Sequence, residues 1–184
     1  MIDFSVILAG FGGQGILSGG KFIATAALME GREVSWFPSY GPEMRGGTAN
    51  CSVVVSDEPI SSPVINEADV LIVMNGPSLD RFINHVKPGG LVILDSSLVL
   101  NPPTRTDVRV FQIPASTLAV EAGNITFAII YLLGCLQAQT GCFSRESFEK
   151  ALADALPTRH HHLIPQELTA FDTGAAYHES LCLK

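Results

Sequence analysis

The sequence contains 184 residues, of which 47% are hydrophobic and only 16% are charged. Lys and Arg number 11 against 18 for Asp and Glu, which gives a formal net charge of −7. This composition excludes a disordered chain and a basic nucleic-acid-binding protein. No apolar stretch reaches the roughly 20 residues of a membrane-spanning helix, and no signal-peptide pattern opens the chain. We therefore expect a soluble, cytoplasmic protein with a single domain over residues 1–184.

The low share of charged residues has a second consequence, because a typical domain carries about 25%. So few charged residues can cover only a limited part of the surface of a small domain. We therefore expect another chain to cover part of this surface. That chain is either a different subunit or, for the isolated protein, a second copy in a homo-oligomer.

Short apolar runs alternate with a helical pattern through residue 113. Residues 4–9 are typical of a buried strand, and residues 16–29 predict a helix that ends near Gly31. A short helix is predicted at 78–85, ended by the segment 87–90. Further strands are predicted at 33–37, 48–56, 69–74, 91–95 and 108–113, and residues 60–64 form either a short strand or an extended loop. The alternation predicts an α/β fold with a Rossmann-like, mainly parallel sheet flanked by helices on both faces.

The remainder of the chain predicts a helical C-terminal part. Helices are expected at 114–121, 124–139 and 145–156, and a last helix at 163–177 is expected to be interrupted at Pro165 and Gly174. Asn124 and Ser144 are predicted N-caps, because their side chains can accept hydrogen bonds from the first N–H groups of a helix.

No metal site is predicted. The four cysteines are spread along the chain, without the paired spacing of zinc ligands or the clustering of iron–sulfur ligands. His160, His161 and His162 are consecutive, so they cannot all face one site on a helix. We interpret them as a polar helix start.

A glycine-rich loop follows the first predicted strand and opens the first predicted helix. It has the pattern G-x-G-x-x-G, in which glycines allow close backbone approach and the helix N-terminus attracts a phosphate. A purely structural tight turn is the alternative. NAD and FAD are disfavoured, because residues 36–39 lack the acid that binds the ribose. Lys21 either contacts a phosphate or is solvated. The candidate ligand-binding residues are Gly10, Gly12, Gly13, Gln14, Gly15 and Lys21.

A second unusual segment, residues 39–47 (SYGPEMRGG), lies at the carboxyl end of the second predicted strand. Ligands of open α/β sheets bind at such ends. Arg45 can pair with a carboxylate or phosphate, and Glu43 can orient it. The alternative is a turn-rich connection with solvated charges. No nucleophile–base pair and no carboxylate pair with a clear role occurs, so we predict no catalytic residue on this chain.

Taken in order, four segments resemble the gamma subunit (gamma domain) of the 2-oxoacid:ferredoxin oxidoreductases. They are residues 10–15 with Lys21, 39–47, 56–60 (SDEPI) and 68–71 (ADVL), and YGPEMRGG is the most specific. The group includes the pyruvate, 2-ketoisovalerate, 2-oxoglutarate and indolepyruvate enzymes. The resemblance covers about residues 6–141 and is looser beyond Gly141.

The resemblance implies a multisubunit enzyme that decarboxylates a 2-oxoacid on thiamine diphosphate, reduces ferredoxin through iron–sulfur clusters and forms an acyl-CoA. It implies that the glycine loop and Lys21 face the phosphates of coenzyme A. It also implies alpha and beta partner subunits, with a ferredoxin-like delta subunit as a further candidate. The residues implied to face the shared active site or a neighbouring subunit are Tyr40, Glu43, Arg45, Gly46 and Gly47.

The sequence agrees with the placement of these cofactors on other subunits. It contains no Gly-Asp-Gly of a thiamine diphosphate site and no grouped cysteines. We therefore expect thiamine diphosphate and the iron–sulfur clusters on partner subunits, and a chain that is inactive alone. Two alternatives stay open: a free-standing Rossmann-type nucleotide-binding dehydrogenase, and a structural assembly subunit whose glycine loop binds nothing.

Overall fold

The structure, a computed structural model, describes residues 4–39 and 48–177. Within these ranges six strands form one sheet in the order β2-β3-β1-β4-β5-β6. The strands are β1 (Phe4–Phe11), β2 (Glu33–Ser39), β3 (Thr48–Ser56), β4 (Ala68–Val73), β5 (Val86–Asp95) and β6 (Arg109–Ile113). The α-helices are α1 (Ile16–Met29), α2 (Gly76–Phe82), α3 (Ala115–Glu121), α4 (Ala128–Thr140), α5 (Arg145–Ala155) and α6 (Ile164–Ala176). The 3₁₀ helices are η1 (Ile83–His85), η2 (Ile125–Phe127) and η3 (Thr158–Leu163).

The sheet is mixed. Strand β1 pairs in parallel with β4, and β4, β5 and β6 continue the parallel arrangement. Strand β3 is antiparallel to both β1 and β2. Only residues 40–47 join β2 to β3, and a parallel crossover needs a dozen or more. The predicted Rossmann-like α/β fold is therefore confirmed, with one edge of the sheet antiparallel.

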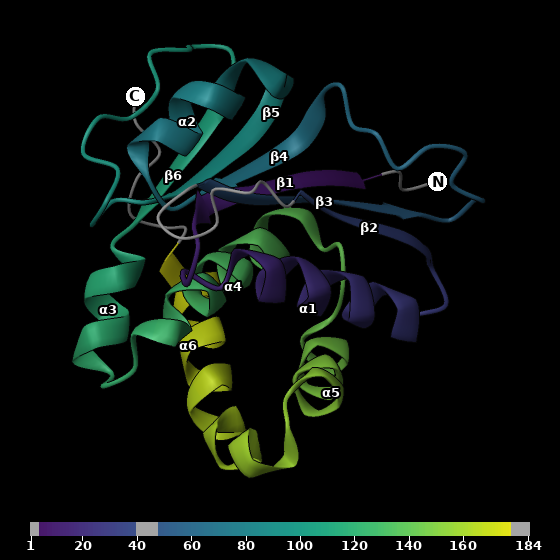
Figure 1. Cartoon of the computed structure of the whole chain (residues 1–184), viewed down its shortest axis with the longest axis vertical. Coiled ribbons are helices and arrows are strands. Elements are labelled where there is room, and N and C mark those ends of the chain that lie inside the picture. The colour runs from purple at the N-terminus through teal and green to yellow at the C-terminus, as the bar shows by residue number, and fades with distance from the viewer. Residues whose placement is uncertain (1–3, 40–47, 178–184) are drawn as a thin grey trace.

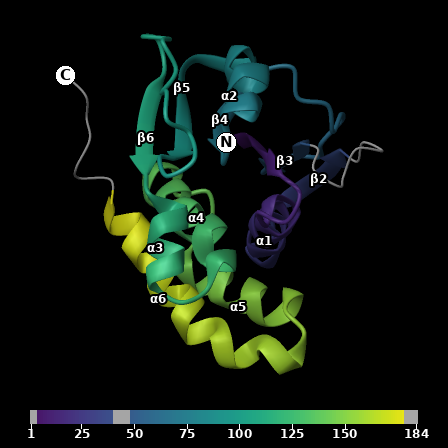
Figure 2. The same cartoon turned by 60° about the vertical axis from the view of Figure 1, so that its left-hand side comes forward.

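Alternate residues of the strands feed two separate cores. Val6 and Leu8 of β1 belong to the larger core, and Ile7 and Ala9 belong to the smaller core on the opposite face. Helices α1, α4, α5 and α6 cover the first face, and α2 covers the second, where Leu79 packs (Figures 1 and 2). Helices thus cover both faces, as predicted, but most of them lie on one side.

Helices α4 and α6 cross at very close range because each has a glycine at the crossing. A Cβ atom at Gly134 would overlap the carbonyl oxygen of Phe171, and one at Gly174 would overlap that of Tyr131. The two helices are close neighbours in both views of the chain (Figures 1 and 2). The sequence predicted that Gly174 would interrupt α6. Instead, α6 is continuous and Gly174 lets it approach α4.

Other local predictions have mixed outcomes. Asn124 and Ser144 are N-caps as predicted: their side chains accept hydrogen bonds from the N–H groups of Thr126 and Ser147. Pro165 also leaves α6 continuous, because it lies in the first turn, where a proline ring is tolerated.

For two other segments, the structure decides between open alternatives or corrects the expected secondary structure. Residues 60–64 are an extended loop, which was one of the two alternatives. The segment 87–90, expected only to end a helix, lies inside β5. Within the described ranges, no helix combines the length and apolar character needed to cross a membrane.

Candidate functional site

The glycine loop carries the chain from the end of β1 directly into α1. Gly13 and Gly15 have φ angles of 95° and 78°, a region that side-chain-bearing residues rarely adopt. Gly15 is the N-cap of α1, and no side chain caps this helix start among the described residues. The first N–H groups of a helix have no partner within the helix, and its dipole favours an anion there. Phosphate sites at helix starts use these same features, so the phosphate site stays a prediction for this loop.

The loop lies between two neighbouring parallel strands whose following helices cover opposite faces of the sheet. Strands β1 and β4 are parallel neighbours, and the helices that follow them, α1 and α2, cover opposite faces. Ligands of open α/β sheets bind in the crevice beyond the carboxyl ends of such a strand pair. Both the sequence motif and the topology therefore indicate the same location.

Gln14 holds the loop in place. Its side-chain oxygen Oε1 accepts a hydrogen bond of 2.6 Å from the Phe11 N–H, and its Nε2 donates one of 3.1 Å to the carbonyl oxygen of Met74. Gly10 leaves room for this side chain, because a Cβ atom there would lie 2.6 Å from Oε1 of Gln14. Of the predicted ligand-binding residues, Gln14 and Gly10 thus shape the loop.

We expect the substitution Gln14→Ala to lower the free energy of unfolding by about 1–2 kcal/mol, because two hydrogen bonds between the loop and the sheet are lost. Urea denaturation of the purified chain measures this change. A residue that only contacted a ligand would leave the stability of the ligand-free chain unchanged. The exposed Gln166 on α6 provides the control, since Gln166→Ala removes an amide without such bonds.

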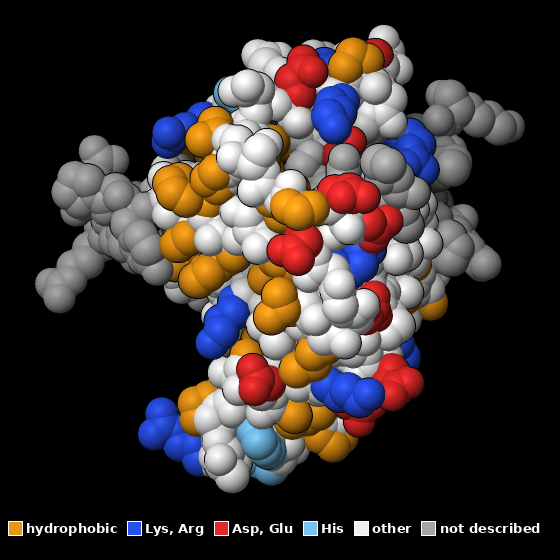
Figure 3. Space-filling model, turned by 90° about the vertical axis from the view of Figure 1, so that its right-hand side faces the viewer, with side chains coloured by type: hydrophobic (Ala, Val, Ile, Leu, Met, Phe, Trp, Pro, Cys, Tyr) orange, Lys and Arg blue, Asp and Glu red, His pale blue; other side chains and the backbone are white. Residues whose placement is uncertain are grey.

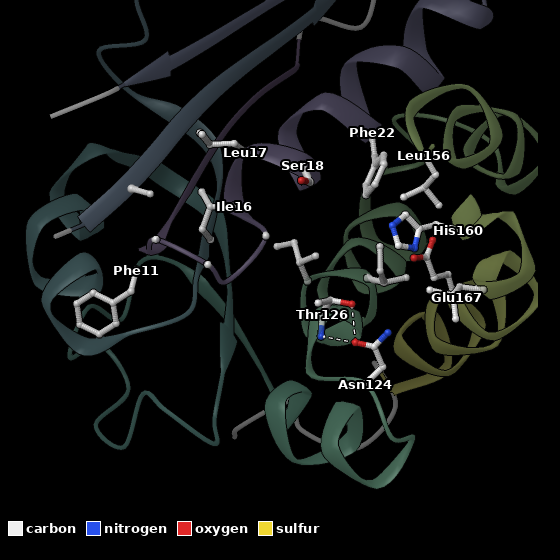
Figure 4. Close-up of a pocket in the computed structure, with 17 residues that line it drawn as sticks. Phe11, Ile16, Leu17, Ser18, Phe22, Asn124, Thr126, Leu156, His160 and Glu167 are labelled. Atoms are coloured by element: carbon white, nitrogen blue, oxygen red, sulfur yellow. Dashed lines mark hydrogen bonds between the residues drawn. The ribbon is translucent and has the colours of Figure 1, made fainter. Parts of the chain in front are cut away.

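A cavity of about 540 Å³ opens beside the loop, a volume in the usual range for small-molecule sites. One wall is formed by the loop and the first turns of α1, from Phe11 to Phe22. The other wall comes from η2, α4, η3 and α6 (Figure 4). Gly15 and Gly19 allow the two walls to meet, because a Cβ atom at either would lie within 3.0 Å of the Ile129 side chain.

The polar groups of the far wall come from segments more than 100 residues beyond the loop. They belong to Asn124, Thr126, His160 and Glu167, of which the sequence analysis singled out Asn124 only as a cap and His160 only as a helix start. Figure 4 shows His160 and Glu167 on the α6 side of the cavity, and both residues line it.

Glu167 was missed by the sequence analysis. It is only 6% exposed, and its oxygen Oε2 is buried without a hydrogen-bond partner. Burial raises the pKa of its carboxyl group. A signal was present: Ile164, Glu167, Leu168 and Phe171 have the spacing of one helix face, so the acid lies on the apolar face of α6.

The structure brings only some of the predicted residues to the cavity. Gly12, Gly13 and Gly15 line it, whereas Lys21 is exposed on α1 and does not line it. Tyr40, Glu43, Arg45, Gly46 and Gly47 lie outside the described residues, so their place relative to the cavity stays a prediction.

The described residues contain no cluster of three or more His, Cys, Asp or Glu side chains that could hold a metal ion. His160, His161 and His162 lie in η3, and Nε2 of His160 accepts a hydrogen bond of 3.1 Å from Nε of Arg159. Cys51, Cys135 and Cys142 are buried, and burial raises the pKa of each thiol to about 12. These thiols are therefore poor candidates for metal ligands.

The fold and the glycine loop define an α/β protein with a glycine-rich strand–loop–helix unit. Comparison with known proteins identifies it further: residues 5–177 match the family described as "Pyruvate ferredoxin/flavodoxin oxidoreductase", and the chain belongs to this family. The family resemblance found in the sequence is confirmed.

A similar curated protein is the ketoisovalerate oxidoreductase subunit VorA of Methanothermobacter thermautotrophicus, with 40% identity over 95% of this chain. The chain spans 36% of the length of that relative and 31% of its counterpart in Methanothermobacter marburgensis.

Two solved structures are similar along nearly the whole chain. The keto/oxoacid ferredoxin oxidoreductase gamma subunit of Geobacter sulfurreducens is 28% identical, with a TM-score of 0.83 over 96% of this chain and 99% of its own. The 2-oxoglutarate:ferredoxin oxidoreductase of Magnetococcus marinus, with 2-oxoglutarate, coenzyme A and succinyl-CoA bound, is 28% identical, with a TM-score of 0.89. The match covers 98% of this chain and 32% of that one. These neighbours confirm the α/β fold of a gamma-type chain.

Proposed function

We propose that this chain acts as the gamma subunit of a multisubunit 2-oxoacid:ferredoxin oxidoreductase and contributes the phosphate-binding part of a coenzyme A site. The observation that carries the proposal is the family match over residues 5–177. Such an enzyme oxidatively decarboxylates a 2-oxoacid to an acyl-CoA and reduces ferredoxin. The similar enzyme from Magnetococcus marinus has coenzyme A bound, which supports this choice of ligand.

The residues of this chain fit the phosphate end of coenzyme A. The backbone N–H groups of Gly12, Gly13 and Gly15 and the start of α1 offer donors and a favourable dipole to an anion without any excess of Lys and Arg. Lys21, on the next turn of α1, supplies a positive charge near this end of the helix. The apolar part of the cavity beside the loop is large enough to hold a further portion of the ligand.

We assign thiamine diphosphate and the iron–sulfur clusters to partner subunits, for which alpha and beta subunits are expected and a ferredoxin-like delta subunit is a further candidate. The chain lacks the sequence pattern of a thiamine diphosphate site, and its described thiols are buried. The redox centres are therefore placed on the partner subunits. It would complete a site made mainly by its partners and would be inactive alone.

Contact with such partners is supported by the low share of charged residues, 16%, against about 25% in a typical domain. Phe37 on the edge strand β2 is 53% exposed and Leu100 is 81% exposed. Figure 3 shows apolar side chains distributed among charged ones over the face that lies at the right of Figure 1. Exposed apolar side chains scattered in this way also occur on monomers, so the composition carries this part of the proposal.

Purification of the chain from its native host tests the proposed complex. We expect it to bring along subunits that contain thiamine diphosphate and iron–sulfur clusters, visible by mass spectrometry and by the absorption of the clusters. Recovery of a solitary, fully active enzyme would contradict the proposal. A titration with NAD and NADP distinguishes the proposal from a free-standing dehydrogenase. For such a dehydrogenase we expect binding of NAD or NADP to shift the melting temperature.

Lys21 is the residue whose role in coenzyme A binding is most directly testable. If its ammonium group contacts a phosphate, we expect Lys21→Ala to weaken coenzyme A binding to the reconstituted enzyme by about 1–3 kcal/mol, the scale of a charged hydrogen bond. Isothermal titration calorimetry measures this loss.

The matched control is Lys150→Ala on α5, where the lysine forms an exposed ion pair of 2.7 Å with Glu146. This change should leave the affinity unaltered. Equal affinities of the Lys21→Ala complex and the unaltered complex would assign Lys21 to the solvated surface. An unaltered complex that binds no coenzyme A at all would favour the structural assembly role instead.

A further inference from the structure

The described residues that line the cavity beside the glycine loop include no Lys or Arg. Polar recognition by this lining therefore depends on neutral side chains and on backbone groups. The hydroxyl groups of Ser18 and Thr126 can rotate, and the ring of His160 has two neutral tautomers. The amide of Asn124 differs from these groups, because its hydrogen bonds fix its orientation.

Two donors of Thr126 share one oxygen of the Asn124 side chain. The backbone N–H of Thr126 donates a hydrogen bond of 3.0 Å to Oδ1 of Asn124, and its hydroxyl group donates one of 2.7 Å to the same atom. A backbone N–H can only donate, so the amide atom that faces it is the oxygen. The amide nitrogen Nδ2 therefore takes the other position. Figure 4 shows both bonds on the oxygen side of the amide, away from Nδ2.

The backbone of Asn124 is held on both sides as well. Its N–H donates a hydrogen bond of 2.9 Å to the carbonyl oxygen of Ala119, and its own carbonyl oxygen accepts one of 3.0 Å from the Phe127 N–H. The Nδ2 group thus has a fixed position on the wall of the cavity. A group that is already held in place loses little freedom when a ligand binds to it.

The Nδ2 group of Asn124 is available to a ligand. It donates to no described residue, and it is not among the buried polar atoms that lack a partner, so it keeps access to the solvent. Asn124 itself is partly buried and lines the cavity. Ile129, which follows it by about one and a half turns of the same helical segment, is the residue that Gly15 and Gly19 approach. The amide therefore belongs to the wall that meets the glycine loop.

A helix cap is the simplest alternative role for Asn124. The cap uses only Oδ1, and Asp or Ser caps a helix about as well as Asn. Neither of them offers an amide N–H at the position of Nδ2. The stability of the helix therefore does not require Nδ2, and a contact with a ligand would.

We propose that Nδ2 of Asn124 donates a hydrogen bond to an acceptor oxygen of the ligand whose phosphate the glycine loop binds. The acceptor is a phosphate oxygen or a carbonyl oxygen, since both accept from an amide N–H. Asn124 is then a binding residue that faces the loop from the opposite wall. This inference rests on the proposed function, because it concerns the same cavity.

Two substitutions separate the donor from the cap. Asn124→Asp keeps the cap but replaces Nδ2 by an oxygen of a negatively charged group, and Asn124→Ser keeps the cap and removes the amide. We expect Asn124→Asp to weaken coenzyme A binding to the reconstituted complex by more than roughly tenfold, and Asn124→Ser by roughly threefold to tenfold. Isothermal titration calorimetry measures both losses. The melting temperatures of both full-length variants should stay within roughly 2 °C of that of the unaltered chain.

Asn84→Asp is the matched control for the added negative charge. Asn84 is exposed in η1 and does not line the cavity. This substitution should leave the affinity for coenzyme A unaltered.

Two further ligands identify the acceptor oxygen. Dephosphocoenzyme A lacks the ribose phosphate, and adenosine diphosphate also lacks the pantetheine amides. If Asn124→Asp weakens only coenzyme A binding, the acceptor is the ribose phosphate. If it also weakens adenosine diphosphate binding, the acceptor is the diphosphate. If it weakens the binding of both coenzymes but not that of adenosine diphosphate, the acceptor is an amide carbonyl. Each of these patterns supports the proposed hydrogen bond.

Two results would overturn this inference while leaving the proposed function intact. The first is an equal coenzyme A affinity for the Asn124→Asp complex, the Asn124→Ser complex and the unaltered complex, which would leave Asn124 as a cap alone. The second is a lower melting temperature for both variants, which would assign their loss of affinity to the fold. If only one variant melts early, the affinity of the other decides. An unaltered complex that binds no coenzyme A would instead overturn the proposed function, and this inference with it.

Discussion

The substitution Gly174→Ala should lower the free energy of unfolding by roughly 3 kcal/mol, an overpacking effect at the upper end of the usual range. The added methyl group would overlap the carbonyl oxygen of Tyr131 on α4. A backbone carbonyl cannot rotate away as the end of a side chain can, so α6 must move away from α4. Alanine is the better helix former by about 1 kcal/mol, but this gain is smaller than the cost of separating two packed helices. Urea denaturation with a two-state fit measures the change.

Gly76→Ala is the matched control for this prediction. Gly76 is also a helical glycine, at the start of α2, and a Cβ atom there meets no atom within 4 Å. Its substitution should change stability by less than about 0.5 kcal/mol. Similar losses for the two variants would mean that a general property of helical glycines, and not the crossing of α4 and α6, governs the result.

The parts of the fold that were predictable from sequence depend on local patterns. The strand–loop–helix unit from β1 to α1 follows from an apolar run, glycines and a helical apolar face within 26 residues of one another. The caps Asn124 and Ser144 were predictable for the same reason, because a cap interacts with N–H groups two or three residues away. The antiparallel position of β3 between β2 and β1 depends on pairing of distant segments, which no local pattern specifies.

The site was predictable only on the side formed by the glycine loop. The opposite wall comes from η2, α4, η3 and α6. Helix α4 approaches the loop across Gly15 and Gly19, and α6 packs against α4 across Gly134 and Gly174. Gly174 was expected to interrupt the helix, because a glycine that permits close packing has the same local signature as one that ends a helix. Glu167 became a candidate only when the packing of α6 placed this residue on the wall of the cavity.

Phe148 connects the two walls of this cavity. Its ring lies edge-on to Phe22 of α1 at a centroid distance of 6.2 Å and stacks on Phe171 of α6 at 4.2 Å. Phe22 lines the cavity, and Phe171 follows Glu167 by one turn of α6. Phe148 itself is completely buried and does not line the cavity. Its side chain therefore sets the position of both walls without contacting a bound ligand.

Phe148→Ala should lower the free energy of unfolding by about 3–5 kcal/mol, the cost of losing a buried aromatic side chain and leaving a cavity. Because α1 and α6 lose a common support, ligand affinity should also fall in the fraction of protein that remains folded. Urea denaturation measures the first effect, and calorimetric titration of the reconstituted complex at low temperature measures the second. Phe37→Ala on the exposed edge strand β2 is the control and should cost less than about 1 kcal/mol in the isolated chain. Unchanged affinity in folded Phe148→Ala protein would show that the cavity walls are positioned independently of the aromatic cluster beneath them.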